Sequence, residues 1–227
     1  MFKNILKLVV VFVLGIAGGI FADQILWPYL EHVPVYVTET NEITIQENVA
    51  LQQAIEKVEK AVIGVRTKTK EGKILSGSGV VVTSDGLMVT LAELLPQGES
   101  FAFFLDGKTP QYQVLKRDLK NNLVLVKIEE QNLPTIGFAD FGRLKLGERV
   151  FLVGMILGKD GSYKVVNEGI VKFFDDDHIQ TNILEKNNLA GSPLFNIQGE
   201  LLGLNTINSE GNVIAIPVTK LRQFVGF

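Results

Sequence analysis

The chain has 227 residues, of which 46% are hydrophobic and 21% are charged, and its net charge at pH 7 is −3. This composition excludes a disordered acidic or basic chain, and without a block of lysine and arginine we expect no nucleic-acid partner. The chain has no cysteine, which excludes disulfides, thiolate metal sites and thiol nucleophiles. Only two histidines, His32 and His178, are available to a catalytic or metal site.

The first 30 residues have the pattern of a membrane anchor. Lys3 and Lys7 precede an uncharged stretch at 8–22, and the apolar segment of about eighteen residues is just long enough to cross a bilayer. Lysines before the segment, and none soon after it, predict a cytoplasmic amino terminus and an extracytoplasmic or periplasmic body. Trp27 and Tyr29 then lie where an interfacial aromatic belt is expected.

A signal peptide cut after Ala22 is the alternative to an uncleaved anchor. Ile20 occupies the position where signal peptidases require a small residue, so we favour a single-pass anchor at 1–30. The mixed, acidic stretch at 31–48 is interpreted as a tether.

The remaining residues, 49–227, are predicted to form an all-β domain with short helices at both ends. Helical spacing of apolar residues begins at Val49, and 219–227 has a second helical pattern. Between them lie short apolar runs at 62–67, 79–82, 87–90, 101–105, 123–128, 150–153, 169–174, 179–181, 201–205 and 213–216. Turn residues separate the runs, and Ser84-Asp85-Gly86 and Gln198-Gly199 are expected to connect hairpins. This pattern predicts a barrel or a sandwich.

Four segments carry more specific motifs. Residues 76–95 read SGSGVVVTSDGLMVTLAELL, 118–128 read DLKNNLVLVKI, 133–154 read LPTIGFADFGRLKLGERVFLVG, and 179–206 read IQTNILEKNNLAGSPLFNIQGELLGLNT. In this order and spacing, they resemble the HtrA (Deg) family of trypsin-like serine proteases. They are similar to its strand before the catalytic histidine, its catalytic aspartate stretch, its connector between two barrels, and its nucleophile loop.

The resemblance implies a chymotrypsin/trypsin-like double β-barrel. The implied parts are a first barrel at 62–130, a connector at 131–147, a second barrel at 148–217 and a C-terminal helix at 218–227. Since no sequence follows Phe227 for the peptide-binding PDZ domain that many members carry, we expect a member without that domain.

Acyl transfer on such a fold needs an alcohol, an imidazole and a carboxylate. The resemblance places Glu93 at the histidine position, Asn122 at the aspartate position and Ala190 at the serine position. Ala190 has no nucleophile, Glu93 is a weak base near pH 7, and Asn122 cannot stabilise a charged partner. The sequence therefore predicts a pseudoprotease with no catalytic residues.

Substitute catalytic groups are difficult to assemble from the other residues. Ser192 is interpreted as a loop-packing residue, with a displaced nucleophile as the alternative, and the spacing does not require Lys186 as its partner. His178 follows the acidic run 175–177 in what is predicted to be a solvated turn, and His32 belongs to the membrane boundary. With no cysteine, two distant histidines and a consecutive acidic run, the sequence predicts neither a metal site nor a cofactor.

A peptide-binding site remains compatible with these replacements. The family's oxyanion-hole glycine corresponds to Asn188, which tolerates a left-handed backbone and allows the loop shape to persist. The resemblance also implies that peptides pair with the strand at 204–207, a mode of recognition that needs no triad. The expected peptide-binding residues are Asn188, Leu189, Ala190, Gly191, Leu204, Asn205, Thr206 and Ile207.

Three functions follow from this pattern. The favoured one is membrane-anchored binding of extended peptides, unfolded protein or partner subunits without hydrolysis, as in protein quality control. The first alternative is a residually active endopeptidase that uses non-standard residues. The second is a structural domain that forms a homo-oligomer, such as the trimer common in the family, or that lends an interface to an active paralogue.

Overall fold

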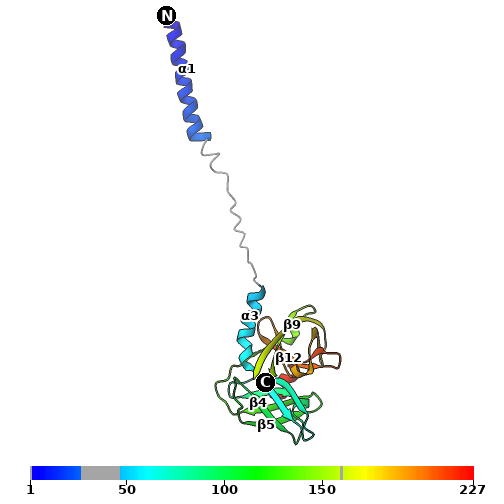
Figure 1. Cartoon of the computed structure of the whole chain (residues 1–227). Coiled ribbons are helices and arrows are strands. Elements are labelled where there is room, and N and C mark those ends of the chain that lie inside the picture. Colours follow the sequence, from blue (N-terminus) through cyan, green and yellow to red (C-terminus); the bar gives the residue numbers. More distant parts are fainter. Residues whose placement is uncertain (1, 27–46, 159–160) are drawn as a thin grey trace. The chain divides into compact units, whose positions relative to one another are not determined.

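The computed structural model describes residues 2–26, 47–158 and 161–227, which belong to two separate units (Figure 1). The first unit contains helix α1 (Phe2–Phe21), which continues as a π-helical turn, η1 (Ala22–Leu26). Residues 2–25 form one apolar helix of 24 residues with no buried side chain. At about 1.5 Å per residue, such a helix is long enough to cross a membrane.

Several expectations for this region lie outside the described residues. They concern the interfacial Trp27 and Tyr29, the boundary residue His32, and the tether as far as residue 46. The next described element, α3 (Glu47–Val58), overlaps the last two residues of the tether expected at 31–48.

Helix α3 and the 3₁₀ turn η2 (Glu59–Ala61) form the predicted helix before the first strand. Ala54 and Val58, one helical turn apart, are buried in α3, and Ala61 is buried in η2. The helix packs on the turn between two later strands, where Lys57 donates to the carbonyl of Gln198 at 3.0 Å. Gly199 has a φ of 74°, and a Cβ atom added there would lie 3.2 Å from Val58, so a residue with a side chain would be strained in this turn.

The first sheet is formed by six antiparallel strands in the order β4-β1-β2-β3-β6-β5. They are β1 (Val62–Lys68), β2 (Ile74–Val81), β3 (Leu87–Leu91), β4 (Ser100–Phe104), β5 (Tyr112–Asp118) and β6 (Leu123–Ile128). The two outer strands approach each other through Tyr112, whose ring meets that of Phe103 edge-on at 4.8 Å. This contact between the two outer strands, β4 and β5, nearly closes the sheet into a barrel.

The second sheet has seven strands in the order β11-β8-β9-β10-β13-β12-β7, and a β11–β12 pairing closes it. They are β7 (Gly137–Phe138), β8 (Arg149–Leu157), β9 (Ser162–Phe174), β10 (Ile179–Leu184), β11 (Pro193–Asn196), β12 (Glu200–Ile207) and β13 (Asn212–Pro217). Helix α4 (Val218–Val225) follows and ends at Gly226, which has a φ of 98°. The predicted double barrel, hairpin turns and closing helix are confirmed.

One hydrophobic cluster spans the two sheets and fixes the position of the loops between them, and a second cluster lies within the second barrel. Buried side chains of β1, β6, β8 and β11 belong to the same cluster. Strands β1 and β8 come so close that a Cβ atom on Gly64 would lie 2.8 Å from the sulfur of Met155. The Ser78 hydroxyl, also buried, accepts a hydrogen bond from the Met155 backbone N–H at 2.9 Å. These contacts hold β2 against the second barrel.

Candidate functional site

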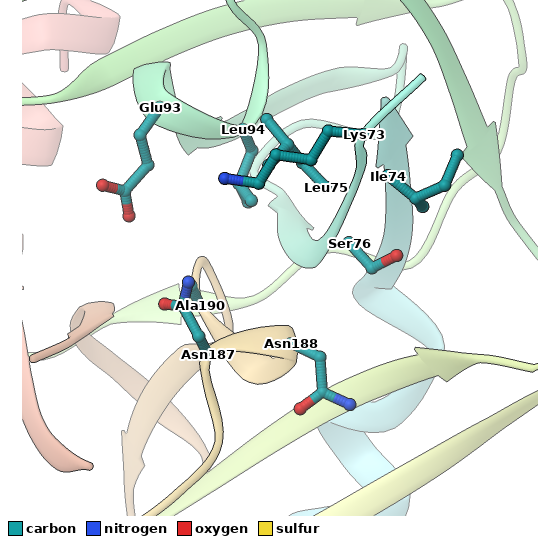
Figure 2. Close-up of a pocket in the computed structure, with 9 residues that line it drawn as sticks. All are labelled: Lys73, Ile74, Leu75, Ser76, Glu93, Leu94, Asn187, Asn188 and Ala190. Carbon is teal, nitrogen blue, oxygen red and sulfur yellow. The ribbon is translucent and has the colours of Figure 1, made fainter. Parts of the chain in front are cut away.

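A cleft of about 520 Å³ lies where β2 meets two short turns, η3 (Ala92–Leu94) and η5 (Asn187–Leu189) (Figure 2). Its walls combine residues from both barrels. They are Lys73, Ile74, Leu75, Ser76, Glu93, Leu94, Asn187, Asn188 and Ala190. The predicted site residue Glu93 therefore comes together in one cavity with Asn188 and Ala190, which lie far from it in sequence.

Asn122 does not line the cleft, but it holds the turn that carries Glu93. Its side-chain oxygen accepts a hydrogen bond from the Glu93 backbone N–H at 3.0 Å, and its carbonyl accepts one from Ala92 at 3.0 Å. Asn122 has a φ of 55°, a left-handed conformation that asparagine tolerates better than most residues. The residue is thus suited to position the η3 turn, whereas the Glu93 side chain is exposed to solvent.

The loop around Ala190 is bonded to both barrels. The Ala190 carbonyl accepts from Ser78 of β2 at 2.9 Å, and Gly191 donates to the Asn205 carbonyl of β12 at 2.7 Å. The Ala190 backbone N–H donates to the Asn187 carbonyl at 3.1 Å within the turn η5. This amide is therefore engaged inside the loop and does not face the cleft as a free donor.

Ser192 is fully buried and does not line the cleft. Its hydroxyl accepts a hydrogen bond from the side-chain amide of Asn205 at 3.1 Å, which agrees with a packing role. Lys186, the partner considered for a serine–lysine pair, is exposed at the start of the turn η5.

The predicted peptide-binding strand is largely enclosed. Leu204 and Asn205 are fully buried, and β12 pairs with β13 from Gly203 to Ile207. On the other side, Leu204 pairs with Pro193, and the Asn205 N–H donates to the Ser192 carbonyl at 2.9 Å. Only Thr206 and Ile207, both half-buried, lie beyond this second pairing. Pairing of a peptide with 204–207 stays a prediction, and it can involve only the last two residues.

Strand β2 offers an open edge that the sequence did not reveal. Ser78 donates to the Ala190 carbonyl, so its N–H and C=O point away from β1. Because this direction alternates along a strand, the N–H and C=O groups of Ser76 and Ile74 point the same way. Strand β3 pairs with β2 only from Gly79 onward. The edge at Ile74 and Ser76 therefore borders the cleft, and none of the described strands pairs with it there.

His178 lies away from the cleft, in a smaller cavity lined by Lys120, Asn122, Asp177 and Lys220, among others. Its ring is mostly exposed, 3.8 Å from Asp175. A hydrogen bond from Lys220 holds the pKa of Asp177 below its usual range. Among the described residues, no three histidine, aspartate or glutamate side chains are arranged to hold a metal ion.

Comparisons with known proteins agree with this geometry. The family model described as a trypsin-like peptidase domain matches residues 77–204. A probable periplasmic DegP-like serine endoprotease from Halomonas elongata is 28% identical over 149 residues, which cover 63% of this chain and 31% of that protein. Serine protease HTRA1A from Danio rerio is 30% identical over 196 residues, which cover 77% of this chain and 40% of the relative.

A solved HtrA-type protease with a tripeptide has the same fold, with a TM-score of 0.69 and 22% sequence identity. The match covers 78% of this chain and 62% of that one. The chain spans less than half the length of these curated relatives. The matches to the family model, to the curated relatives and to the fold agree. The chain belongs to the trypsin-like peptidase domain family, and its relatives place it with the HtrA/DegP proteins.

Proposed function

We propose that this chain is a membrane-anchored, HtrA-like pseudoprotease that binds extended peptides or unfolded protein segments without hydrolysing them. One observation carries the proposal. The cleft is bordered by the unpaired β2 edge at Ile74 and Ser76, yet Ala190 in its wall has no side-chain nucleophile and a backbone N–H that is already bonded.

The chemistry of the cleft argues against peptide hydrolysis. Among the described residues, no imidazole lines it, and the hydroxyl of Ser76 points away from Glu93 in Figure 2. An oxyanion hole without a nucleophile would supply at most about 10³–10⁴-fold acceleration over water. Loss of one oxyanion donor lowers the rate by about another 10²–10³-fold. The Ala190 N–H, engaged by Asn187, corresponds to such a lost donor.

Peptide binding at this edge would use the hydrogen bonds of a β-sheet. An extended peptide placed beside β2 pairs with the N–H and C=O groups of Ile74 and Ser76 and directs alternate side chains into the cleft. The experiment is fluorescence anisotropy with the 227-residue chain in nanodiscs and an apolar octapeptide. N-methylation of one alternate set of peptide amides should abolish binding, whereas methylation of the other set should not.

Two proline variants identify the strand that the peptide uses. In Ser76→Pro, proline removes only an N–H that faces the open edge, a position that sheets tolerate. Ile207→Pro is the matched change on β12. The backbone N–H of Asn205 points away from β13, and the N–H of Ile207, two residues later, points the same way. We expect weaker binding in Ser76→Pro and unchanged binding in Ile207→Pro. The reverse result would assign the peptide to β12.

The same proposal includes an extracytoplasmic location of the β domain. It rests on the apolar helix at 2–25, the flanking Lys3 and Lys7, and the periplasmic naming of the bacterial relatives. Since the chain has no cysteine, single cysteines can report orientation. In cells whose outer layers are permeabilised but whose anchoring membrane is intact, a membrane-impermeant maleimide should label Ser209→Cys but not Lys3→Cys. The opposite labelling would reverse the orientation.

An assembly role is the second candidate. The outer face of β9 and β10 exposes Ile170, Phe173 and Leu184, each more than 40% exposed. Exposed apolar side chains of this size are common at protein–protein contacts. Light scattering in detergent tests this role, which predicts an oligomer that Phe173→Glu dissociates. A monomer at all concentrations would rule it out for the chain alone.

A further inference from the structure

The cleft contains hydrogen-bond acceptors that have no partner among the described residues, and one of them is charged. Within the part of the chain that the structure describes, the Glu93 carboxylate and the Asn187 carboxamide have no hydrogen-bond or ion-pair partner. The open edge of β2 adds the backbone N–H and carbonyl groups of Ile74 and Ser76. The Ala190 N–H, which could otherwise serve as a donor, is bonded to Asn187.

The side chains of the cleft converge on one space. In Figure 2, the Glu93 carboxylate, the Asn187 carboxamide and the Lys73 ammonium all point toward the open centre of the cavity. Lys73 and Glu93 are both exposed, and the structure records no ion pair between them. The carboxylate therefore lacks a fixed counter-ion, although a flexible cation lies at the rim.

We propose that the cleft recognises a primary ammonium group of the bound peptide, with Glu93 as its counter-ion. This inference rests on the proposed peptide-binding function. An ammonium group brings three donors and a positive charge, which match the carboxylate and the Asn187 carboxamide. Lys73 competes for the same acceptors in the empty cleft. A glutamate at this position thus selects a ligand, where an imidazole would serve as a base.

The ammonium group has two chemical sources in a peptide, a lysine side chain and a free amino terminus. An extended peptide on the β2 edge can direct a lysine side chain into the cleft, because alternate side chains face it. A peptide that ends in the cleft presents its amino terminus instead. Both sources have the same charge and donor set, so binding data with matched peptides distinguish them.

The test uses anisotropy with the 227-residue chain in nanodiscs and four apolar octapeptides. They are an acetylated neutral peptide, the same peptide with one lysine, the same peptide with one acetyl-lysine, and the neutral peptide with a free amino terminus. We expect one of the two ammonium peptides to bind about three- to fivefold more tightly than its acetylated counterpart. High salt should reduce this preference but should not change the affinity for the neutral peptide.

Three variants locate the preference. Glu93→Gln should abolish it, and Lys73→Met should increase it, because the competing cation is removed. Glu71→Gln is the matched control, since it removes an exposed carboxylate from the neighbouring turn that does not line the cleft, and it should retain the preference.

Equal binding of all four peptides, or a preference that persists in Glu93→Gln, would overturn the ammonium site while peptide binding stands. If none of the peptides binds, both the ammonium site and the proposed function are wrong.

Discussion

The Ala190 backbone N–H donates a hydrogen bond to the Asn187 carbonyl at 3.1 Å, and this bond closes the turn η5 in the wall of the cleft. In an acyl-transfer enzyme of this fold, the corresponding amide stabilises the developing oxyanion. Here the carbonyl of Asn187 satisfies it. The loop is thus organised as a self-bonded turn, in keeping with a binding surface.

Asn122 substitutions should separate two contributions to the stability of the η3 turn. Asn122→Ala loses the acceptor for the Glu93 N–H and places a Cβ-bearing residue without a polar side chain at a φ of 55°. We expect it to lower the free energy of unfolding by about 1–2 kcal/mol. Asn122→Gly tolerates the left-handed backbone, so its free energy of unfolding should fall less. Asn122→Asp keeps the acceptor for the Glu93 N–H. Urea unfolding measures all three, and an Ala variant as stable as wild type would contradict the role.

Gly191 is predicted to be essential for the shape of the loop. It has a φ of 77°, and a Cβ atom there would lie 2.2 Å from the Ser78 carbonyl oxygen. Gly147 has nearly the same φ, 78°, with no atom within 4 Å, so it is a matched control. Gly147→Ala should lower stability by about 1 kcal/mol, and Gly191→Ala by about 3 kcal/mol or more. Equal losses would mean that the β2 contact does not constrain the loop.

Ser192→Ala should affect stability and not chemistry. The change removes the acceptor of the buried Asn205 amide, so we expect a loss of about 1–3 kcal/mol in urea unfolding. Ser209→Ala, at an exposed position, should be neutral. A fluorophosphonate probe that labels wild type but not Ser192→Ala would instead identify Ser192 as a nucleophile.

The contact between Asp177 and Lys220 should make stability depend on pH in the acid range. It joins the β9–β10 turn to α4, and it lowers the pKa of Asp177 in the folded state. The folded state therefore holds the charged carboxylate more strongly than the unfolded state. The stabilisation is present above the unfolded pKa of about 3.9 and is lost as pH falls through the lower folded value. Asp177→Asn should show a smaller decrease in urea midpoint between pH 5 and pH 2.5, and an identical decrease would contradict this.

Strands with strongly apolar sequences could be predicted because their side chains enter the core. β6, for example, is buried at every position except Lys127, and its run was recognised. β5 was missed because it is an edge strand with several exposed residues, including Leu115. β11 has only four residues and begins with Pro193, and β7 has two that pair in parallel with β12. Such pairings depend on distant strands.

The candidate site was predictable only in part. The motifs identified Glu93, Ala190 and Asn188, which share the cleft, and Asn122, which supports Glu93. The cleft wall at 73–76 was not recognised, because an open edge depends on where β3 stops pairing. The use of the Ala190 N–H by Asn187 likewise depends on a loop conformation that composition does not reveal.

The most direct test of the central claim combines binding and cleavage in one sample. The chain in nanodiscs, as wild type and as Ala190→Ser, is incubated with the apolar octapeptide and analysed by mass spectrometry after anisotropy reports binding. We predict that the peptide remains intact with both proteins. The variant still has a glutamate instead of an imidazole at position 93, and the backbone N–H of residue 190 is still bonded to Asn187. Cleavage of the bound peptide by the wild-type chain would contradict a pseudoprotease.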